Sequence, residues 1–232
     1  MATVWTLAST KGGCGKTTLT AIIAGEIVKN GGTVVLIDTD KNTPLMRWAA
    51  KNRLPDAVTV LDATDKSGRE LTDALQGLKD SRSFVLIDTE GTRNMLTGLA
   101  VQQSSVVVIP MKWSELDVAE ALKIQDFVAV ASQARGRPIP SVIVPSQVDA
   151  VIESKAQRAV KKALADTGAT WIDPPVLTKS PYVAMFTEGR LLHDLDTTTN
   201  SQVLQNAKDN AHAVVKAIGK AAVDFAHASA AG

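Results

Sequence analysis

The sequence contains a single cysteine, Cys14, among its 232 residues. One cysteine cannot form an internal disulfide, so nothing in the chain indicates an oxidising compartment. Long hydrophobic runs are also missing. The longest, such as Val106–Pro110, are far too short to span a bilayer, and no charged segment precedes an apolar core at the N-terminus. We therefore expect a cytoplasmic protein without stable membrane insertion.

An excess of charge of one sign is absent as well. Lys and Arg total 25, and Asp and Glu total 24. This balance excludes a uniformly basic protein that coats nucleic acid, but it allows a local basic patch. Hydrophobic residues make up 45% of the chain, enough to bury a sizeable core. Because 232 residues fit one α/β domain better than two, we expect a single domain over residues 1–232.

Short β-branched runs alternate with segments that can form helices. Nearly continuous apolar runs are typical of strands covered on both faces in a parallel sheet. The expected strands are Val4–Ala8, Val34–Ile37, Val58–Leu61, Phe84–Ile87, Val106–Ile109 and Val142–Val144. The expected helices are Lys16–Asn30, Thr43–Lys51, Glu70–Leu78, Asn94–Gln102, Glu115–Ser132 and Ser154–Asp166. This alternation predicts an α/β fold with a doubly wound, mostly parallel sheet, helices on both faces and right-handed crossovers.

The last third of the sequence is less regular. Pro174, Pro175 and Pro181 indicate a loop-rich stretch, and residues 226–232 look like a frayed tail. Between them, apolar residues recur at helical spacing from Ser201 to Phe225, which predicts a helix packed on the sheet. A membrane-binding helix is the alternative. Such helices favour bulky apolar residues and a basic face, whereas this segment is rich in alanine.

The strongest motif, Lys11-Gly-Gly-Cys-Gly-Lys-Thr-Thr18, follows the first expected strand and opens a helix. Glycines let several backbone N–H groups face one phosphate, and the helix N-terminus adds partial positive charge. Lys16 can reach the β- and γ-phosphates, Thr17 can bind Mg²⁺, and Thr18 can contact the α-phosphate. The motif predicts a Mg-nucleotide site formed by Gly12, Gly13, Cys14, Gly15, Lys16, Thr17 and Thr18.

This motif departs from the general phosphate loop, because Thr10 stands where glycine is usual and Lys11 follows it. In this respect it resembles the deviant Walker A motif of the ParA/MinD ATPase family, and the resemblance covers essentially the whole chain. It implies a Mg-ATP-dependent ATPase that switches between a monomer and an ATP-sandwich dimer. Lys11 would then reach the partner's nucleotide, where a cation stabilises charge on the transferred phosphoryl group.

Carboxylates follow the second and fourth expected strands, in Leu36-Ile-Asp-Thr-Asp40 and Phe84-Val-Leu-Ile-Asp-Thr-Glu-Gly91. A carboxylate just past a buried strand end lies beside the phosphate loop of a doubly wound sheet. The resemblance implies that Asp38 helps to hold the Mg²⁺ shell, that Asp40 positions the attacking water and that Asp88 binds Mg²⁺ through a water. Glu90-Gly91 begins the expected second switch, where the family often has Pro-Pro.

Two regions are candidates for contact with adenine from their position alone. They are Gln147, near the end of the sixth strand, and the loop 178–183 with Pro181. Three other segments resemble the VirC-type ATPase of T-DNA transfer, namely residues 40–48, 110–121 and 187–193.

The resemblance also implies a partner, since ParA proteins in their ATP state bind DNA without sequence preference. Basic residues recur in the expected helix 154–166, and three of them can share a face that meets phosphates. They are Lys155, Arg158, Lys161 and Lys162, for which an ordinary solvated helix face is the alternative. Two roles remain open: plasmid or chromosome partition on the nucleoid with a centromere-binding, ParB-like partner, or recruitment of a relaxosome to the cell pole.

Overall fold

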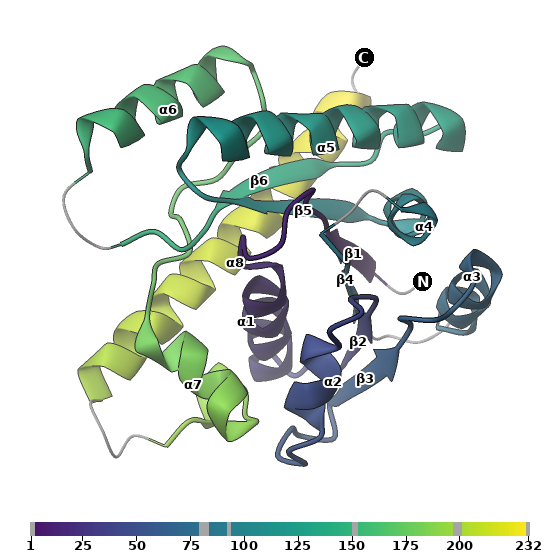
Figure 1. Cartoon of the computed structure of the whole chain (residues 1–232), viewed down its shortest axis with the longest axis vertical. Helices are drawn as coiled ribbons and strands as arrows, with labels where there is room; N and C mark the ends of the chain where they lie inside the picture. The colour runs from purple at the N-terminus through teal and green to yellow at the C-terminus, as the bar shows by residue number, and fades with distance from the viewer. Residues whose placement is uncertain (1–2, 79–83, 92–93, 150–152, 197–200, 231–232) are drawn as a thin grey trace.

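Six parallel strands form one sheet at the centre of the molecule (Figure 1). The computed structural model describes residues 3–78, 84–91, 94–149, 153–196 and 201–230. The strands are ordered β3-β2-β4-β1-β5-β6. Their bounds are β1 Thr3–Leu7, β2 Val34–Asp38, β3 Val58–Asp62, β4 Phe84–Asp88, β5 Val106–Met111 and β6 Ser141–Pro145. The predicted doubly wound α/β fold is confirmed, and every pairing between these strands is parallel.

Helices cover both faces of this sheet, so its strands are buried on two sides, as their continuous apolar sequences predict. One face carries α1 (Lys16–Lys29), α2 (Pro44–Ala49), α7 (Ser180–Glu188), the short 3₁₀ helix η1 (Leu192–Asp194) and α8 (Ser201–Ala230). The other face carries α3 (Gly68–Gly77), α4 (Met95–Gln103), α5 (Glu115–Arg135) and α6 (Lys155–Asp166).

The end of α1 shows how local sequence sets an element boundary. Gly31 takes a φ of 79°, which a residue with a Cβ adopts only at a cost. Its N–H donates to the carbonyl of Val28, and the N–H of Gly32 donates to the carbonyl of Ile27. These two bonds form a Schellman motif, which satisfies carbonyls that the helix itself leaves without donors. The glycine pair therefore ends α1, as the sequence predicts.

Two expectations for the C-terminal part need correction. The stretch expected to be rich in loops contains the helix α7. Pro181 is compatible with this helix because it lies in the first turn, where a missing N–H removes no intrahelical hydrogen bond. The expected frayed tail is also wrong for residues 226–230, which continue α8 as far as Ala230. Among the described residues, no helix is both long enough and apolar enough to cross a membrane.

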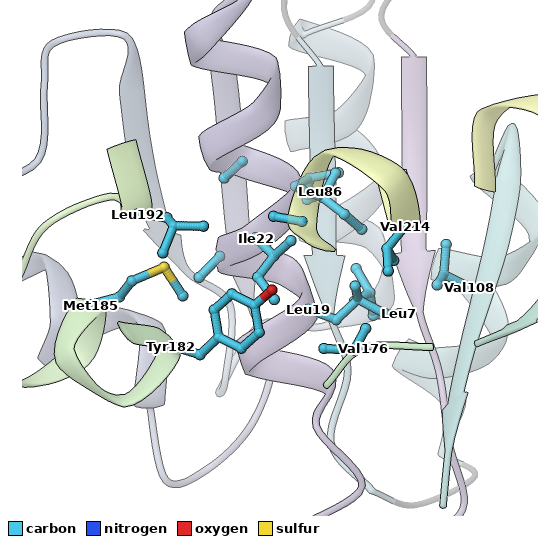
Figure 2. Packing of buried hydrophobic residues seen from close by; sticks show 14 of the residues in the cluster. Leu7, Leu19, Ile22, Leu86, Val108, Val176, Tyr182, Met185, Leu192 and Val214 are labelled. Atoms are coloured by element: carbon cyan, nitrogen blue, oxygen red, sulfur yellow. The ribbon is translucent and has the colours of Figure 1, made fainter. Parts of the chain in front are cut away.

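The apolar stripe of α8 packs into the core, so the predicted interior role is confirmed. Leu204, Ala207, Val214 and Ile218 are all buried in the cluster that α1 and the sheet also form. Figure 2 shows Val214 beside Leu7 and Val108 of the sheet, with Leu19 and Ile22 of α1 on the neighbouring side. The stripe is therefore covered by protein.

A buried carboxylate ties α1 to the C-terminal elements. Glu26 of α1 is 3% exposed, and it accepts hydrogen bonds from His193 Nε2 at 2.6 Å and His212 Nδ1 at 3.0 Å. Burial alone would raise the pKa of Glu26, but the hydrogen bonds from the two histidines outweigh it and hold the pKa below its ordinary value. Glu26 therefore stabilises the fold mainly in its ionised form.

Replacing Glu26 with Gln should destabilise the protein, because an amide accepts these two hydrogen bonds less strongly than a carboxylate. We expect a loss of about 1–3 kcal/mol, or roughly 2–10 °C in Tm for a chain of this size. Since the folded pKa of Glu26 lies below 4.5, the deficit should be full above about pH 4.5 and shrink as the pH falls further.

Thermal melts from pH 4 to pH 8 would measure the deficit. Asp126→Asn, an exposed acid-to-amide change on α5, is the matched control. A Glu26→Gln variant as stable as the control at pH 7 would contradict the assignment.

Candidate functional site

The carboxyl edge of the sheet gathers the motifs that the sequence singles out. In the parallel register, Asp88 of β4 pairs with Leu7 of β1 on one side and with Asp38 of β2 on the other. The segment Ala8–Gly15 leaves β1 at this edge and leads into α1. The predicted phosphate loop and two of the predicted carboxylates are therefore neighbours, as strand ends of a doubly wound sheet should be.

The loop itself adopts a conformation that depends on two glycines. Gly13 has a φ of 75° and Gly15 a φ of 97°, in the left-handed region that side chains disfavour. Two carbonyls of the loop accept hydrogen bonds from side chains that follow β6. Ser146 Oγ donates to the Cys14 carbonyl at 2.7 Å, and Gln147 Nε2 donates to the Gly13 carbonyl at 3.1 Å. Ser146 and Gln147 thus both lie against the phosphate loop. The expected contact of Gln147 with adenine stays a prediction.

Lys16 is the buried cation of the loop, with only 6% of its surface exposed. Its Nζ donates to Ser9 Oγ at 3.0 Å and to the Lys11 carbonyl at 3.2 Å. The ammonium is therefore folded back over its own loop, onto two neutral acceptors. Such acceptors compensate a buried positive charge only weakly, which favours an anion taking their place. Ser9 has no motif signal, so sequence reasoning missed it.

Asp88 and Thr17 form the centre of a candidate cation site. Thr17 Oγ1 donates to Asp88 Oδ2 at 2.6 Å, while Asp88 Oδ1 is buried and has no hydrogen-bond partner among the residues that the structure describes. Desolvation raises the pKa of Asp88 to about 7, against the hydrogen bond from Thr17 and the attraction of Lys16, and repulsion from Asp38 adds to the rise. A hydroxyl beside a buried carboxylate with one free oxygen fits a hard cation such as Mg²⁺.

Asp38 is buried next to Asp88 but is already engaged by the backbone. Asp38 Oδ1 accepts from the N–H of Asp40 at 3.1 Å, and Oδ2 accepts from the N–H groups of Leu45 at 2.8 Å and Met46 at 3.3 Å. Burial raises its pKa, although these bonds oppose the rise. Asp38 therefore anchors the start of α2, a role that sequence reasoning missed. Asp40 is less buried and accepts from both nitrogens of Asn42.

Lys11 points away from the buried end of the loop, toward α5. Its Nζ lies 3.5 Å from Asp117 Oδ1, and 43% of its side chain remains exposed. The neighbouring Thr10 donates to Glu120 of the same helix. On the other side, a Cβ on Gly91 would lie 2.7 Å from the Gly12 nitrogen, so the second switch packs directly on the loop backbone. Asp117, which lies in the VirC-like segment 110–121 but had no role assigned to it there, is thus the partner of Lys11.

A cavity of about 350 Å³ adjoins the phosphate loop. Gly15 and Thr18 form its inner end, Gln147 forms one side, and Val183 and Phe186 of α7 form an apolar wall. The prediction for Pro181 needs correction, because this residue lies on another face of α7 and lines a separate depression with Ala184 and Leu195. The helical spacing that turns Val183 and Phe186 toward the loop turns Pro181 away.

The basic helix α6 lies on the other face of the sheet, packed through Val160 and Leu164. Lys155, Arg158 and Lys162 are exposed on it. Lys161 differs, since its Nζ lies 2.8 Å from Glu153 and 5.4 Å from the centre of the Trp113 ring. The patch is therefore narrower than the sequence suggests, because Lys161 is held by an ion pair and an aromatic ring.

Known proteins resemble this chain in sequence or in fold. A sequence model of the VirC1 protein family matches residues 2–225. The protein ParA of Rhizobium radiobacter is 28% identical over 218 residues, which cover 93% of this chain and 97% of that protein. Two solved structures share the fold. McdA of Cyanothece in complex with ATP has a TM-score of 0.65 and 16% identity, covering 90% of this chain and 96% of McdA.

The second solved structure, the cell division protein MinD of Aquifex aeolicus, has a TM-score of 0.67 and 18% identity, covering 91% of this chain and 96% of MinD. The family match spans nearly all of the chain, and the motif residues stand together at one edge of the sheet. This chain belongs to the VirC1 protein family, and it shares its fold with McdA and MinD.

Proposed function

We propose that this chain hydrolyses Mg-ATP, forms an ATP-sandwich homodimer, and in that form binds DNA without sequence preference to serve plasmid or chromosome partition. The observation that carries the proposal is the clustering of Lys16, Thr17 and Asp88 at one sheet edge, with the exposed Lys11 beside them. Solved relatives of the same fold include one in complex with ATP, which supports the choice of nucleotide.

Nucleotide binding would reorganise contacts that the loop now makes with itself. Lys16 would leave Ser9 Oγ and the Lys11 carbonyl for the β- and γ-phosphates, while the backbone N–H groups of residues 12–18 surround the phosphate chain. The base would enter the 350 Å³ cavity, against Val183 and Phe186 and beside Gln147. Apolar walls with a few polar groups are typical of such pockets.

Mg-ATP brings a Mg²⁺ ion that needs protein ligands, and the chemistry this ion would supply is positive charge against that of the phosphates. Thr17 and Asp88 would hold this ion, Asp88 through a water, and Asp38 would support the shell from the neighbouring strand. Asp40 would orient the attacking water, which is the main task of the protein when the transition state is loose. Its carboxylate is partly exposed and, within the described part of the chain, accepts hydrogen bonds from the nearby Asn42, so few contacts would have to be replaced.

Dimerisation would complete the site through Lys11. Its weak contact with Asp117, at 3.5 Å and partly exposed, can be exchanged for the phosphates of the partner's nucleotide. The exchange brings a positive charge to the negative charge that develops on the transferred phosphoryl group. A lysine that is engaged within its own subunit before ATP binds, and across the interface afterwards, would couple dimerisation to hydrolysis.

A second role is favoured by the VirC1 family match over residues 2–225. In this alternative the same ATP-dependent dimer is a platform in the cytoplasm, at the cell pole, that recruits a relaxosome for DNA transfer. Neighbouring genes would separate the roles, since a small centromere-binding, ParB-like protein implies partition and relaxosome genes imply transfer.

Lys16→Ala should weaken ATP binding by about 10- to 100-fold, since a charged hydrogen bond is worth about 1.5–3 kcal/mol. Isothermal titration with Mg-ATP would measure the change, with Lys66→Ala on the exposed surface as the control. Equal affinity in the two variants would remove the phosphate-loop assignment.

Lys11→Ala should bind ATP with nearly unchanged affinity but fail to dimerise, because two phosphate clusters would face each other without the bridging cation. Light scattering with Mg-ATP would report the mass, and ATPase assays should show a loss of hydrolysis in parallel. An ATP-dependent dimer of normal stability in this variant would rule out the sandwich arrangement.

Replacing Lys155, Arg158 and Lys162 with Glu should abolish duplex binding while ATP hydrolysis without DNA persists. In the wild type, log affinity should fall by about 0.9 per phosphate contact per log unit of salt. Anisotropy titrations on unrelated duplexes, with and without ATP, would test both points. The charge-matched control replaces Lys66, Arg69 and Arg137 with Glu. If the affinity for duplex DNA changes neither with ATP nor with the triple substitution on α6, the assignment of the basic patch to DNA binding is wrong.

A further inference from the structure

The short helix α2 connects the carboxylate edge of the sheet to the wall of the base cavity. At its start, Asp38 accepts the N–H groups of Leu45 and Met46. At its end, the side chains of Trp48 and Lys51 reach α7, which lies more than a hundred residues further along the chain. Figure 1 shows α2 and α7 on the same side of the sheet as α1.

Trp48 is the buried half of this connection, with 1% of its surface exposed. Its Nε1 donates to the Met185 carbonyl at 2.9 Å. Its ring lies 5.5 Å from the ring of Phe186, centre to centre, at a tilt of 46°. Such a tilted pair prefers one relative orientation over others. The indole therefore fixes both the backbone and one aromatic side chain of α7.

Lys51 is the exposed residue of the connection between α2 and α7. Its Nζ donates to the Thr187 carbonyl at 2.7 Å. Gly189, which follows α7 with a φ of 73°, lies so close that a Cβ there would collide with the Lys51 side chain. Met185 and Thr187 stand in the last turn of α7, where a positive charge is favourable. The Met185 carbonyl also accepts from the N–H groups of Gly189 and Arg190, so Trp48 adds a further donor at a carbonyl that already closes the helix. Trp48 and Lys51 thus act together as a cap for the C-terminal end of α7.

The capped turn is also the wall of the cavity beside the phosphate loop. Phe186 and Thr187, which Trp48 and Lys51 hold, both line that cavity. We infer that Trp48 and Lys51 are positioning residues for the nucleotide base: they fix α7 so that its wall fits the ring system. This inference rests on the proposed ATP binding. It concerns the base alone, because the hydrogen bonds and the ring contact given for these two side chains all go to α7.

The inference can be tested by comparing Mg-ATP with Mg-tripolyphosphate, which has the phosphate chain but no base. Trp48→Phe keeps an aromatic ring and loses the hydrogen bond, and Lys51→Ala removes an exposed side chain that the core does not need. We expect each variant to bind ATP about 3- to 10-fold more weakly, the effect of one hydrogen bond. Tripolyphosphate should bind both variants as it binds the wild type.

Two further variants sharpen the comparison. Lys51→Arg keeps a donor at the same place and should restore ATP affinity, whereas Arg47→Ala, an exposed change on the same helix, should leave both ligands unaffected. Steady-state kinetics should show a higher KM for ATP with an unchanged kcat.

Unchanged ATP affinity in Trp48→Phe and Lys51→Ala would overturn the inference. Equal losses for ATP and tripolyphosphate would also overturn it, since the variants would then disturb the whole site. A wild-type chain that binds neither ligand would instead refute the proposed function, and the inference with it.

Discussion

The structure depends on two carboxylates, Asp38 and Asp88, that lie buried side by side at the carboxyl edge of the sheet. Two negative charges in a desolvated place cost free energy unless donors or cations face them. Asp38 meets this demand with three backbone N–H groups, two of them from the start of α2. Asp88 meets it only in part, through Thr17, and its pKa rises to about 7. The uncompensated oxygen makes this edge suited to a cation.

This constraint extends to the elements around the site. The phosphate loop is held on three sides: by Ser146 and Gln147 after β6, by Asp117 and Glu120 of α5, and by Gly91 of the second switch. α2 connects Asp38 to the last turn of α7, because its start donates to Asp38 and its Trp48 donates to the Met185 carbonyl. Because Lys11 contacts α5 and Lys16 contacts Ser9 and the loop backbone, a ligand that moves these lysines would change contacts within the loop and with α5.

The proposed nucleotide site and the exposed basic face of α6 lie on different elements, so separate substitutions would change the proposed hydrolysis and the proposed DNA contact. Fold likeness at 16–18% identity specifies the architecture and leaves the partner open. The choice between the two proposed roles, partition and transfer, would therefore depend on surface side chains. On α6 these are Lys155, Arg158 and Lys162, whereas Lys161 serves the contact with Glu153 and Trp113.

The sequence by itself determined the strands, most of the helices, the phosphate loop and the carboxylates that follow β2 and β4. These features depend on local signals: continuous β-branched runs, glycines that permit a positive φ, and the rule that parallel strands share one carboxyl edge. Only the tertiary structure decided which side chains meet. No sequence motif predicts the pairing of Lys11 with Asp117, of Lys16 with Ser9 or of Trp48 with Met185. In two of these pairs the residues are more than a hundred positions apart. Pro181 was misplaced for the same reason, because the rotation of α7 that directs Phe186 into the cavity and Pro181 away from it is set by packing against α2 and α8.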